Sequence, residues 1–106
     1  MSTQLRRTEE QIERIKKDLL ALGRMRPGSI TRQYRLPKEK KQPFYQISYT
    51  HQMRSHTEYV RTENLRELRR ETAAFRKFRK LVNRWVELAL QASKLRVAQA
   101  NISTRP

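Results

Sequence analysis

The chain has 106 residues, of which 36% are hydrophobic, and its 25 Lys and Arg against 10 Asp and Glu give a formal net charge of +15. With so few apolar residues, a domain of this length has a thin core, which favours helices that share one apolar seam. The absence of cysteine excludes disulfides, thiolate metal sites and a cysteine nucleophile. No apolar run approaches the roughly 20 residues of a membrane-spanning helix, and the N-terminus has no apolar segment typical of a secretory signal. We therefore expect a single cytoplasmic domain over residues 1–106.

The first expected element is a helix over residues 3–22. Its apolar stripe repeats at spacings of three and four, with one polar member, which is typical of a heptad pattern. The stripe consists of Leu5, Thr8, Ile12, Ile15, Leu19 and Leu22. Gly23 follows at the position where a left-handed residue commonly ends a helix, so we expect it to be the C-cap.

Residues 24–42 are expected to form a basic linker and residues 43–61 a β-hairpin. In the linker, apolar and polar residues alternate from Ile30 to Leu36, which indicates a possible short strand. The hairpin turn is expected within His51–Ser55, which lacks the Asn-Gly signal of a tight two-residue turn. Because a lone hairpin is only marginally stable in water, we expect the linker strand to join it as a third strand.

Residues 62–98 are expected to form a long helix, and the residues after it to be frayed. Its apolar stripe consists of Ala74, Phe78, Leu81, Trp85, Leu88, Ala92 and Leu95. The predicted fold class is therefore α+β: an antiparallel pair of long, coiled-coil-like helices, with a small two- or three-stranded antiparallel sheet between them in sequence. Since this stripe is longer than that of the first helix, its part around Leu88, Ala92 and Leu95 is expected to need another cover, which a homodimer or a larger protein partner would supply.

A run of basic residues in the long helix is the main candidate for function. No acidic residue lies between Phe75 and Arg84, whereas exposed faces usually mix both signs. Such a surface attracts a polyanion, because Lys and Arg displace the counterions condensed on its phosphates. With three arginines from the linker and the hairpin, the predicted nucleic-acid-binding residues are Arg32, Arg35, Arg61, Arg66, Arg69, Arg70, Arg76, Lys77, Arg79, Lys80 and Arg84.

The hairpin offers possible base contacts. A two-stranded ribbon fits the major groove of DNA, and aromatic side chains on a sheet stack on unpaired bases. The candidates are Tyr45, Tyr49, Gln46 and Tyr59. The alternative is that Ile47 and one or two of the tyrosines pack into the core, which a chain this poor in apolar residues needs.

No constellation of residues points to an enzyme. His51 and His56 have no further His or Cys as partners, so we expect no metal site. The acidic residues, serines and threonines show no spacing typical of a catalytic triad or of paired carboxylates, and no Walker loop or GxGxxG turn is present. We therefore predict no catalytic residues and no cofactor.

One segment, MRPGSITRQY at residues 25–34, resembles a family of small bacterial proteins known only as a domain of unknown function. The likeness continues through PFYQISYT at residues 43–50, TEYVR at 57–61 and FRKFRKLV at 75–82, which together extend over most of the chain. Because members of this family often accompany transposases and other mobile elements, the resemblance implies an accessory role on DNA or RNA. Relatives carry a Cys-rich segment after the Gln-Tyr pair, whereas residues 35–41 here are RLPKEKK, so any metal knuckle of the family is lost.

Charge, motifs and resemblance together predict a non-catalytic nucleic-acid-binding protein, an accessory subunit of a mobile-element or phage-type nucleoprotein complex. The expected partners are DNA or RNA, between which the sequence does not choose, and a protein such as a transposase or recombinase. The alternative is an interaction protein, inhibitor-like or antitoxin-like, whose basic face docks an acidic protein. No membrane partner is expected, because the large apolar residues belong to the helical seam. The predicted location is the nucleoid or a cytoplasmic ribonucleoprotein.

Overall fold

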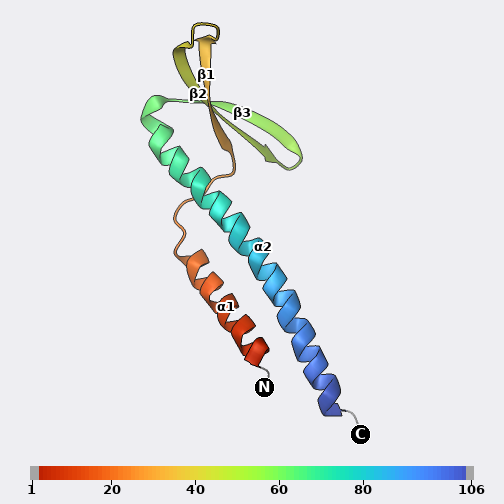
Figure 1. Cartoon of the computed structure of the whole chain (residues 1–106). Coiled ribbons are helices and arrows are strands. Elements are labelled where there is room, and N and C mark those ends of the chain that lie inside the picture. Colours follow the sequence, from red (N-terminus) through yellow and green to blue (C-terminus); the bar gives the residue numbers. More distant parts are fainter. Residues whose placement is uncertain (1–2, 105–106) are drawn as a thin grey trace. The chain divides into compact units, whose positions relative to one another are not determined.

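The computed structural model describes residues 3–104, which fold into a helix, three strands and a second helix (Figure 1). The elements are α1 (Thr3–Leu20), β1 (Ser29–Leu36), β2 (Lys41–His51), β3 (Arg54–Val60) and α2 (Thr62–Thr104). This order confirms the predicted α+β class, and the sheet between the helices has three antiparallel strands. The described chain forms two compact units. We call them the helical unit, which contains α1 and α2 from Phe78 onward, and the sheet unit, residues 23–77.

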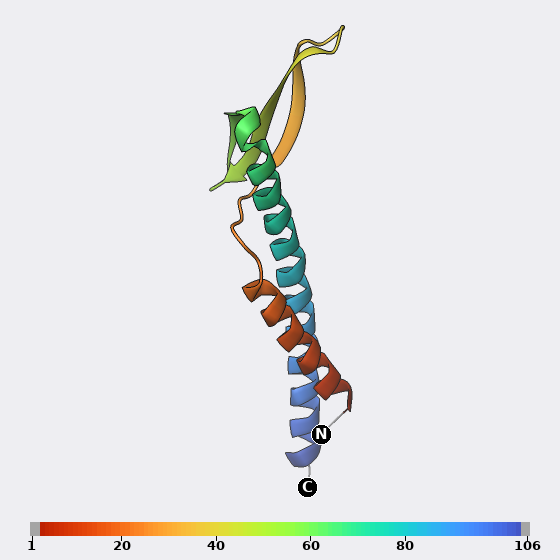
Figure 2. The same ribbon diagram turned by 90° about the vertical axis from the view of Figure 1, so that its left-hand side faces the viewer.

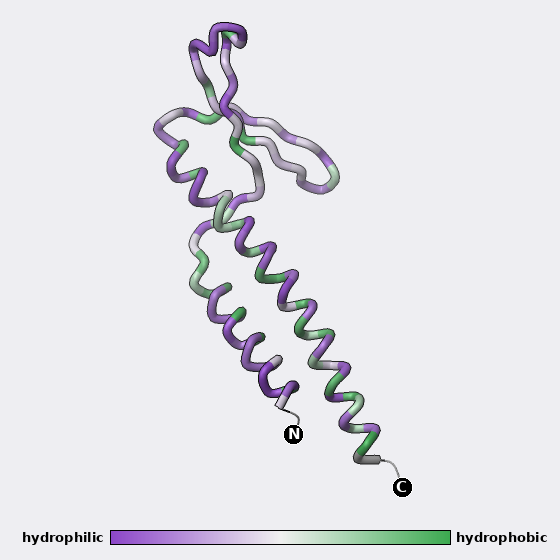
Figure 3. Tube along the Cα trace, viewed as in Figure 1, coloured by the Kyte–Doolittle hydropathy of each residue, from purple (hydrophilic) through white to green (hydrophobic). Residues whose placement is uncertain are grey.

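In the helical unit, α1 lies beside α2 and runs antiparallel to it (Figures 1 and 2). Two contacts between the helices fix this direction: Arg96 donates a hydrogen bond to Glu9 at 3.0 Å, and the Lys16 ammonium lies 5.5 Å from the ring centre of Trp85. Figure 3 shows hydrophobic residues recurring along α2 between hydrophilic ones. The buried apolar residues of this unit are Leu5, Ile15, Leu88 and Ala92, all members of the predicted stripes. The predicted antiparallel helix pair is therefore confirmed.

The end of α1 differs from the sequence prediction. α1 ends at Leu20, and Gly23 is not a left-handed cap, because Gly28 is the glycine with a positive φ, at 147°, in the described chain. The last turn is instead closed by a hydrogen bond from the Leu22 amide to the Leu19 carbonyl at 3.2 Å. Such a tightened turn satisfies a terminal carbonyl without a left-handed glycine. The predicted cap at Gly23 was therefore wrong.

The second helix also differs from the prediction. α2 continues to Thr104 rather than fraying after residue 98, because no Gly or Pro interrupts it and Ala and Gln favour helix there. The predicted uncovered surface was placed wrongly as well. Leu88 and Ala92 are buried, whereas the exposed apolar side chains of this region include Val86 and Leu90. The stripe of α2 is therefore covered where it faces α1, and the uncovered residues belong to a different side of the helix.

In the sheet unit, β2 is the central strand, and β1 and β3 both pair antiparallel with it. The register places Ile30 opposite Ile47, and Tyr45 opposite Val60. Opposite residues of an antiparallel pair share a face, so these four define the inner face, on which Ile47 and Val60 are buried. The other side is the polar face, which consists of Ser29, Thr31, Gln33, Arg35, Gln42, Phe44, Gln46, Ser48, Thr50, Ser55, Thr57 and Tyr59. The predicted third strand is confirmed.

The turn between β2 and β3 lies within the predicted region and has two central residues. Its two central residues are Gln52 and Met53, with φ of 52° and 63°, between the paired residues His51 and Arg54. Positive φ at both central positions is characteristic of a type I′ turn, whose twist matches that of the flanking strands. The predicted turn region, His51–Ser55, is therefore confirmed, and its two-residue form arises without an Asn-Gly pair. The strand pairs next to the turn outweigh the roughly 1–2 kcal/mol that each left-handed residue without glycine costs.

Candidate nucleic-acid interface

Tyr45, on the inner face, is contacted by arginines from two elements. The guanidinium carbon of Arg32, on β1, lies 5.7 Å from the centre of the Tyr45 ring, and that of Arg69, on α2, lies at the same distance of 5.7 Å. Arg32 also donates hydrogen bonds to the Tyr45 hydroxyl at 3.1 Å and to the Tyr34 hydroxyl at 3.5 Å. Cation–π attraction and these hydrogen bonds hold two positive charges at one ring. We call Arg32, Arg69 and Tyr45 the Tyr45 cluster.

The Tyr45 cluster carries its charge uncompensated. Within residues 3–104, neither Arg32 nor Arg69 forms an ion pair with a carboxylate. The hydrogen bond to Tyr34, followed by the one to Tyr45, raises the pKa of Arg32 above its ordinary value, so its charge persists at any physiological pH. The two like charges repel each other. An anion bound between them is attracted by both, which offsets this repulsion. The cluster is therefore suited to a phosphate group.

Arg26 is the residue of this region that the sequence reasoning missed. Its side chain forms an ion pair with Glu58 on β3, and its guanidinium carbon lies 5.2 Å from the ring centre of Tyr49. Its backbone amide donates to the carbonyl of Glu71 on α2 at 3.1 Å. Arg26 thus joins the segment before β1 to the sheet and to α2, and its charge is matched by an acid. No local pattern connects Arg26 with Glu58, which lies 32 residues away.

The predicted base-contact residues divide between the two faces of the sheet. Tyr45 and Tyr49 are on the inner face, where both are half-buried. Tyr49 also stacks on His56, with ring centres 4.9 Å apart and an angle of 18° between the rings. Gln46 and Tyr59 are opposite each other on the polar face, and Tyr59 is 62% exposed. The inner tyrosines thus contact arginines and a histidine of their own chain, while Gln46 and Tyr59 face outward.

Two further predicted arginines lie near the ends of the strands. Arg35 is on the polar face, with its guanidinium carbon 5.2 Å from the ring centre of Phe44. Arg61 follows β3 directly and forms an ion pair with Glu63 at 3.6 Å, both side chains being largely exposed. Exposed ion pairs of this kind contribute about 0–1 kcal/mol. Both arginines therefore remain available to a stronger anionic partner.

The sheet unit also contains the first part of the predicted basic helix. All basic residues there are exposed, namely Arg66, Arg69, Arg70, Arg76 and Lys77. Arg70 is paired with Glu67 at 3.8 Å. Arg66, Arg76 and Lys77 form no ion pair with any acid of the described chain. Arg76 and Lys77 belong to the acid-free stretch of the sequence, whereas Arg66 is unpaired although Glu63 and Glu67 are close to it in sequence.

The helical unit holds the rest of the predicted basic residues. Arg79, Lys80 and Arg84 are exposed on α2. Arg84 donates to Glu87 at 3.1 Å, and Arg79 has an interaction within the chain. Lys80 has no acidic partner among the residues the structure describes. These three residues continue the basic sequence along α2. One of them, Arg84, is paired with an acid.

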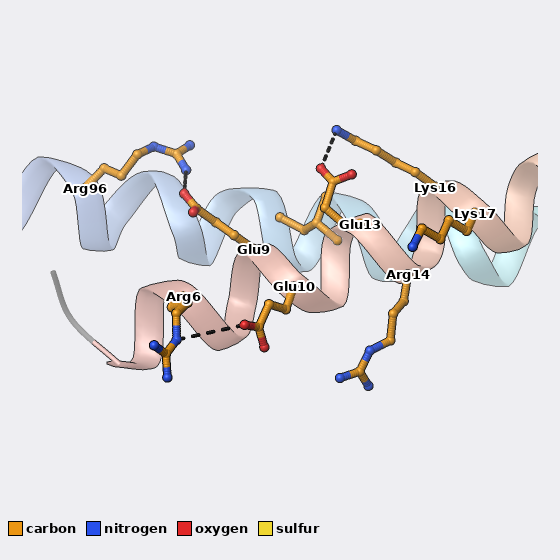
Figure 4. Close-up of a pocket in the computed structure, with 9 residues that line it drawn as sticks. Arg6, Glu9, Glu10, Glu13, Arg14, Lys16, Lys17 and Arg96 are labelled. Carbon is orange, nitrogen blue, oxygen red and sulfur yellow. Dashed lines mark hydrogen bonds and ion pairs between the residues drawn. The ribbon is translucent and has the colours of Figure 1, made fainter.

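A shallow groove on α1 is lined by side chains of both charges (Figure 4). Its three acidic side chains each pair with a basic one, whereas Arg14 and Lys17 form no ion pair with a described acid. Arg6 lies 3.9 Å from Glu10, and Lys16 lies 3.0 Å from Glu13. Arg96 reaches Glu9 from α2 (Figure 4). The mixed charges distinguish this groove from the surface around the Tyr45 cluster.

Comparison with protein-family models, with curated proteins and with solved structures found no match to this chain. The resemblance to the small bacterial family therefore stays a prediction. Among the described residues, no group of three or more His, Cys, Asp or Glu is arranged to hold a metal ion. No helix in residues 3–104 is both long enough and apolar enough to cross a membrane.

Proposed function

We propose that this chain is a non-catalytic nucleic-acid-binding protein that holds phosphates with the basic residues of its sheet unit. The resemblance to proteins that accompany transposases makes an accessory role in a mobile-element nucleoprotein complex the natural setting. The nucleic acid supplies the many negative charges that a chain with a net charge of +15 needs for compensation.

The Tyr45 cluster is the observation that carries this proposal. Arg32 and Arg69 reach the same ring from different elements, and neither has an acid partner in the described chain. Arginine presents a planar fork of donors that matches the geometry of a phosphate. The Tyr45 ring orients both forks before binding, so less side-chain entropy is lost when the phosphate arrives.

The test is fluorescence anisotropy with labelled 20-nucleotide probes at a series of salt concentrations. The probes are duplex DNA, single-stranded DNA, duplex RNA and single-stranded RNA. For duplex DNA, the slope of log K against log salt falls by about 0.9 for each phosphate contact removed. We expect the double variant Arg32→Gln/Arg69→Gln to lose about 1.8 units of slope on that probe.

The matched control is Arg7→Gln/Arg14→Gln, which removes the same charge from exposed residues of α1. This control is expected to keep the slope of the unmodified protein within about 0.5 unit, because long-range charge effects are screened at these salt concentrations. Binding to no probe at low salt contradicts the proposal. If the protein instead retains an acidic protein from nuclease-treated lysate, the interaction-protein alternative replaces it.

A further inference from the structure

The polar face of the sheet has an unusual composition for this protein. Charged residues make up 33% of the chain, yet Arg35 is the sole charged side chain among the described strand residues of this face. Apart from Phe44, every other side chain on it bears a hydroxyl or an amide group. All of these side chains are exposed except Phe44 and Gln46, which are half-buried. The face is thus a surface of neutral hydrogen-bonding groups on a strongly basic protein.

Most hydrogen-bonding groups of this face are not used within the chain. Ser48 and Thr57 are 3.3 Å apart and bond to each other across β2 and β3, and Gln33 donates to Thr31 at 3.4 Å. The side chain of Gln46 makes no hydrogen bond in the described part of the chain. Its donors and acceptors are available to a ligand.

The dimensions of the face match the major groove of DNA. Strands lie about 4.8 Å apart, so two neighbouring strands of this sheet fit within the groove, which is about 12 Å wide and admits a two-stranded ribbon. Residues on one face of a strand recur every 6.8 Å or so, which is about two base-pair steps at 3.4 Å. Gln46, Ser48 and Thr50 on β2 would therefore follow alternate base pairs along the groove.

Most of the positive charge near this neutral face lies at one end of the sheet. Arg35 lies at one end of β1, and Lys38, Lys40 and Lys41 lie in or beside the following turn. Arg61 follows the last residue of β3. In a DNA groove, the phosphates lie along the two rims and the neutral base edges form the floor. The basic residues at this end of the sheet are placed to bind phosphates beside the groove while the neutral face meets the base edges.

Other nucleic acids match this face less well. Duplex RNA has a deep, narrow major groove that side chains cannot read. Single strands are bound by stacking bases on exposed aromatic rings. Among the described strand residues of this face, Tyr59 offers one exposed ring and Phe44 lies half-buried against Arg35, so successive bases of a single strand find no row of rings on which to stack.

We infer that the polar face reads base edges in the major groove of duplex DNA, with Gln46 as a principal reader. This inference rests on the proposed function and adds to it the class of nucleic acid and a sequence preference. Gln matches adenine, because its amide donates to N7 while its carbonyl accepts from N6. Ser and Thr hydroxyls bond to several bases, and the Thr methyl contacts the thymine methyl. A preferred site containing adenine is therefore expected.

The experiment starts with selection of bound sequences from a library of random duplex DNA by the full-length protein. The affinities for the enriched duplex and for a scrambled duplex are then compared by anisotropy. Gln46→Ala is expected to reduce the ratio of these affinities by about 5- to 150-fold. Thr57→Val, which keeps the β-branched shape of the strand, is expected to reduce it in the same direction. The triple variant Lys38→Gln/Lys40→Gln/Lys41→Gln, which removes charge beside this face, should weaken both complexes and leave their ratio unchanged.

A change in the DNA tests the same contact without altering the protein. Replacing adenines of the enriched site by 7-deaza-adenine removes the N7 acceptor from the major groove, and Gln46→Ala should be insensitive to that replacement. If binding enriches no sequence, or if both sheet variants keep the full ratio, the inference is overturned while the proposed function stands. Tighter binding to either RNA probe than to duplex DNA also overturns it. Binding to no nucleic acid overturns both.

Discussion

Gly28 packs so closely against Ile47 that no side chain fits between them. A Cβ atom on Gly28 would lie 2.8 Å from Cγ1 and 2.9 Å from Cδ1 of Ile47. Ile47 is 0% exposed, at the centre of the inner face, so it has no free space into which to move. Gly28 also has φ of 147°, a backbone conformation that residues with a Cβ rarely adopt. The segment entering β1 is therefore part of the core of the sheet unit.

Gly28→Ala is expected to lower the free energy of unfolding by at least about 2 kcal/mol, because backbone strain and overpacking act together. Urea denaturation followed by circular dichroism measures this loss. Gly23→Ala is the matched control, since no atom lies within 4 Å of a Cβ there. That control should be neutral or stabilising by up to about 1 kcal/mol. Equal stability of the two variants would show that Gly28 does not contact Ile47 as described.

Met53→Gly is expected to stabilise the protein. Met53 has φ of 63° in the β2–β3 turn and is 93% exposed, so glycine relieves strain without loss of packing. The gain should be about 1 kcal/mol, seen as a rise in Tm of about 4–8 °C by calorimetry. Ser55→Gly, in β3 next to the turn, should instead destabilise by about 0.5–1 kcal/mol. A fall in Tm for Met53→Gly would argue against the type I′ turn.

Ala92→Leu tests the seam between α1 and α2. Ala92 is 0% exposed in the helical unit, so the added methylenes should cost about 1–3 kcal/mol of unfolding free energy. Ala98→Leu adds the same atoms to an exposed position of α2 and is expected to change stability by less than about 0.5 kcal/mol. Chemical denaturation of both variants gives the comparison. A tolerant Ala92 would mean that α1 does not cover this side of α2.

Replacing Arg76, Lys80 and Arg84 together by Gln tests the basic sequence of α2. If all three hold phosphates, the salt slope on duplex DNA should fall by about 2.7 units, while the helix content is kept. Since Arg84 is already paired with Glu87 at 3.1 Å, a loss nearer to 1.8 units is expected if that pair persists. Anisotropy over a range of salt concentrations measures the slope.

The control for this variant is the replacement of Lys38, Lys40 and Lys41 by Gln. These residues lie in or next to the β1–β2 turn, and Lys41 is within 3.9 Å of Glu39. Their loss should reduce the slope less, because long exposed side chains on a turn lose more entropy on binding. An unchanged slope for the α2 variant would identify that part of the helix as an ordinary solvated surface.

The parts of the fold that depend on repetition could be predicted from the sequence. The heptad spacing predicts which side of each helix is apolar. The stripes contain Leu5 and Ile15 in α1 and Leu88 and Ala92 in α2, and all four are buried. The alternation of apolar and polar residues predicted the strands, and hence their pairing, in the same way. The two-residue form of the turn at Met53 could not be predicted, because its strained conformation is favoured by the strand pairs around it and not by its own residue type.

The candidate site was predictable only as a set of charges. Local runs of Lys and Arg showed where acids are lacking, but they did not show that Arg32 and Arg69 meet at Tyr45. That meeting depends on the register of β1 with β2, which pairs Arg32 with Tyr45, and on the contact of Arg69 with a strand residue far away in the sequence. The ion pair of Arg26 with Glu58 has the same origin. Such contacts between distant segments determine which arginines have an acidic partner and which do not.

The meander order of the strands has a consequence for the kinetics of folding. Each strand pairs with its neighbour along the chain through a short turn, at residues 37–40 and 52–53, so little loop entropy is lost when the sheet closes. The contact of Glu9 with Arg96 instead spans 87 residues. During synthesis at about 5–20 residues per second, the strands can pair roughly 2–7 s before Arg96 is made. During that interval, the apolar stripe of α1 has no partner. The exposed stripe leaves the growing chain open to aggregation or to capture by a chaperone.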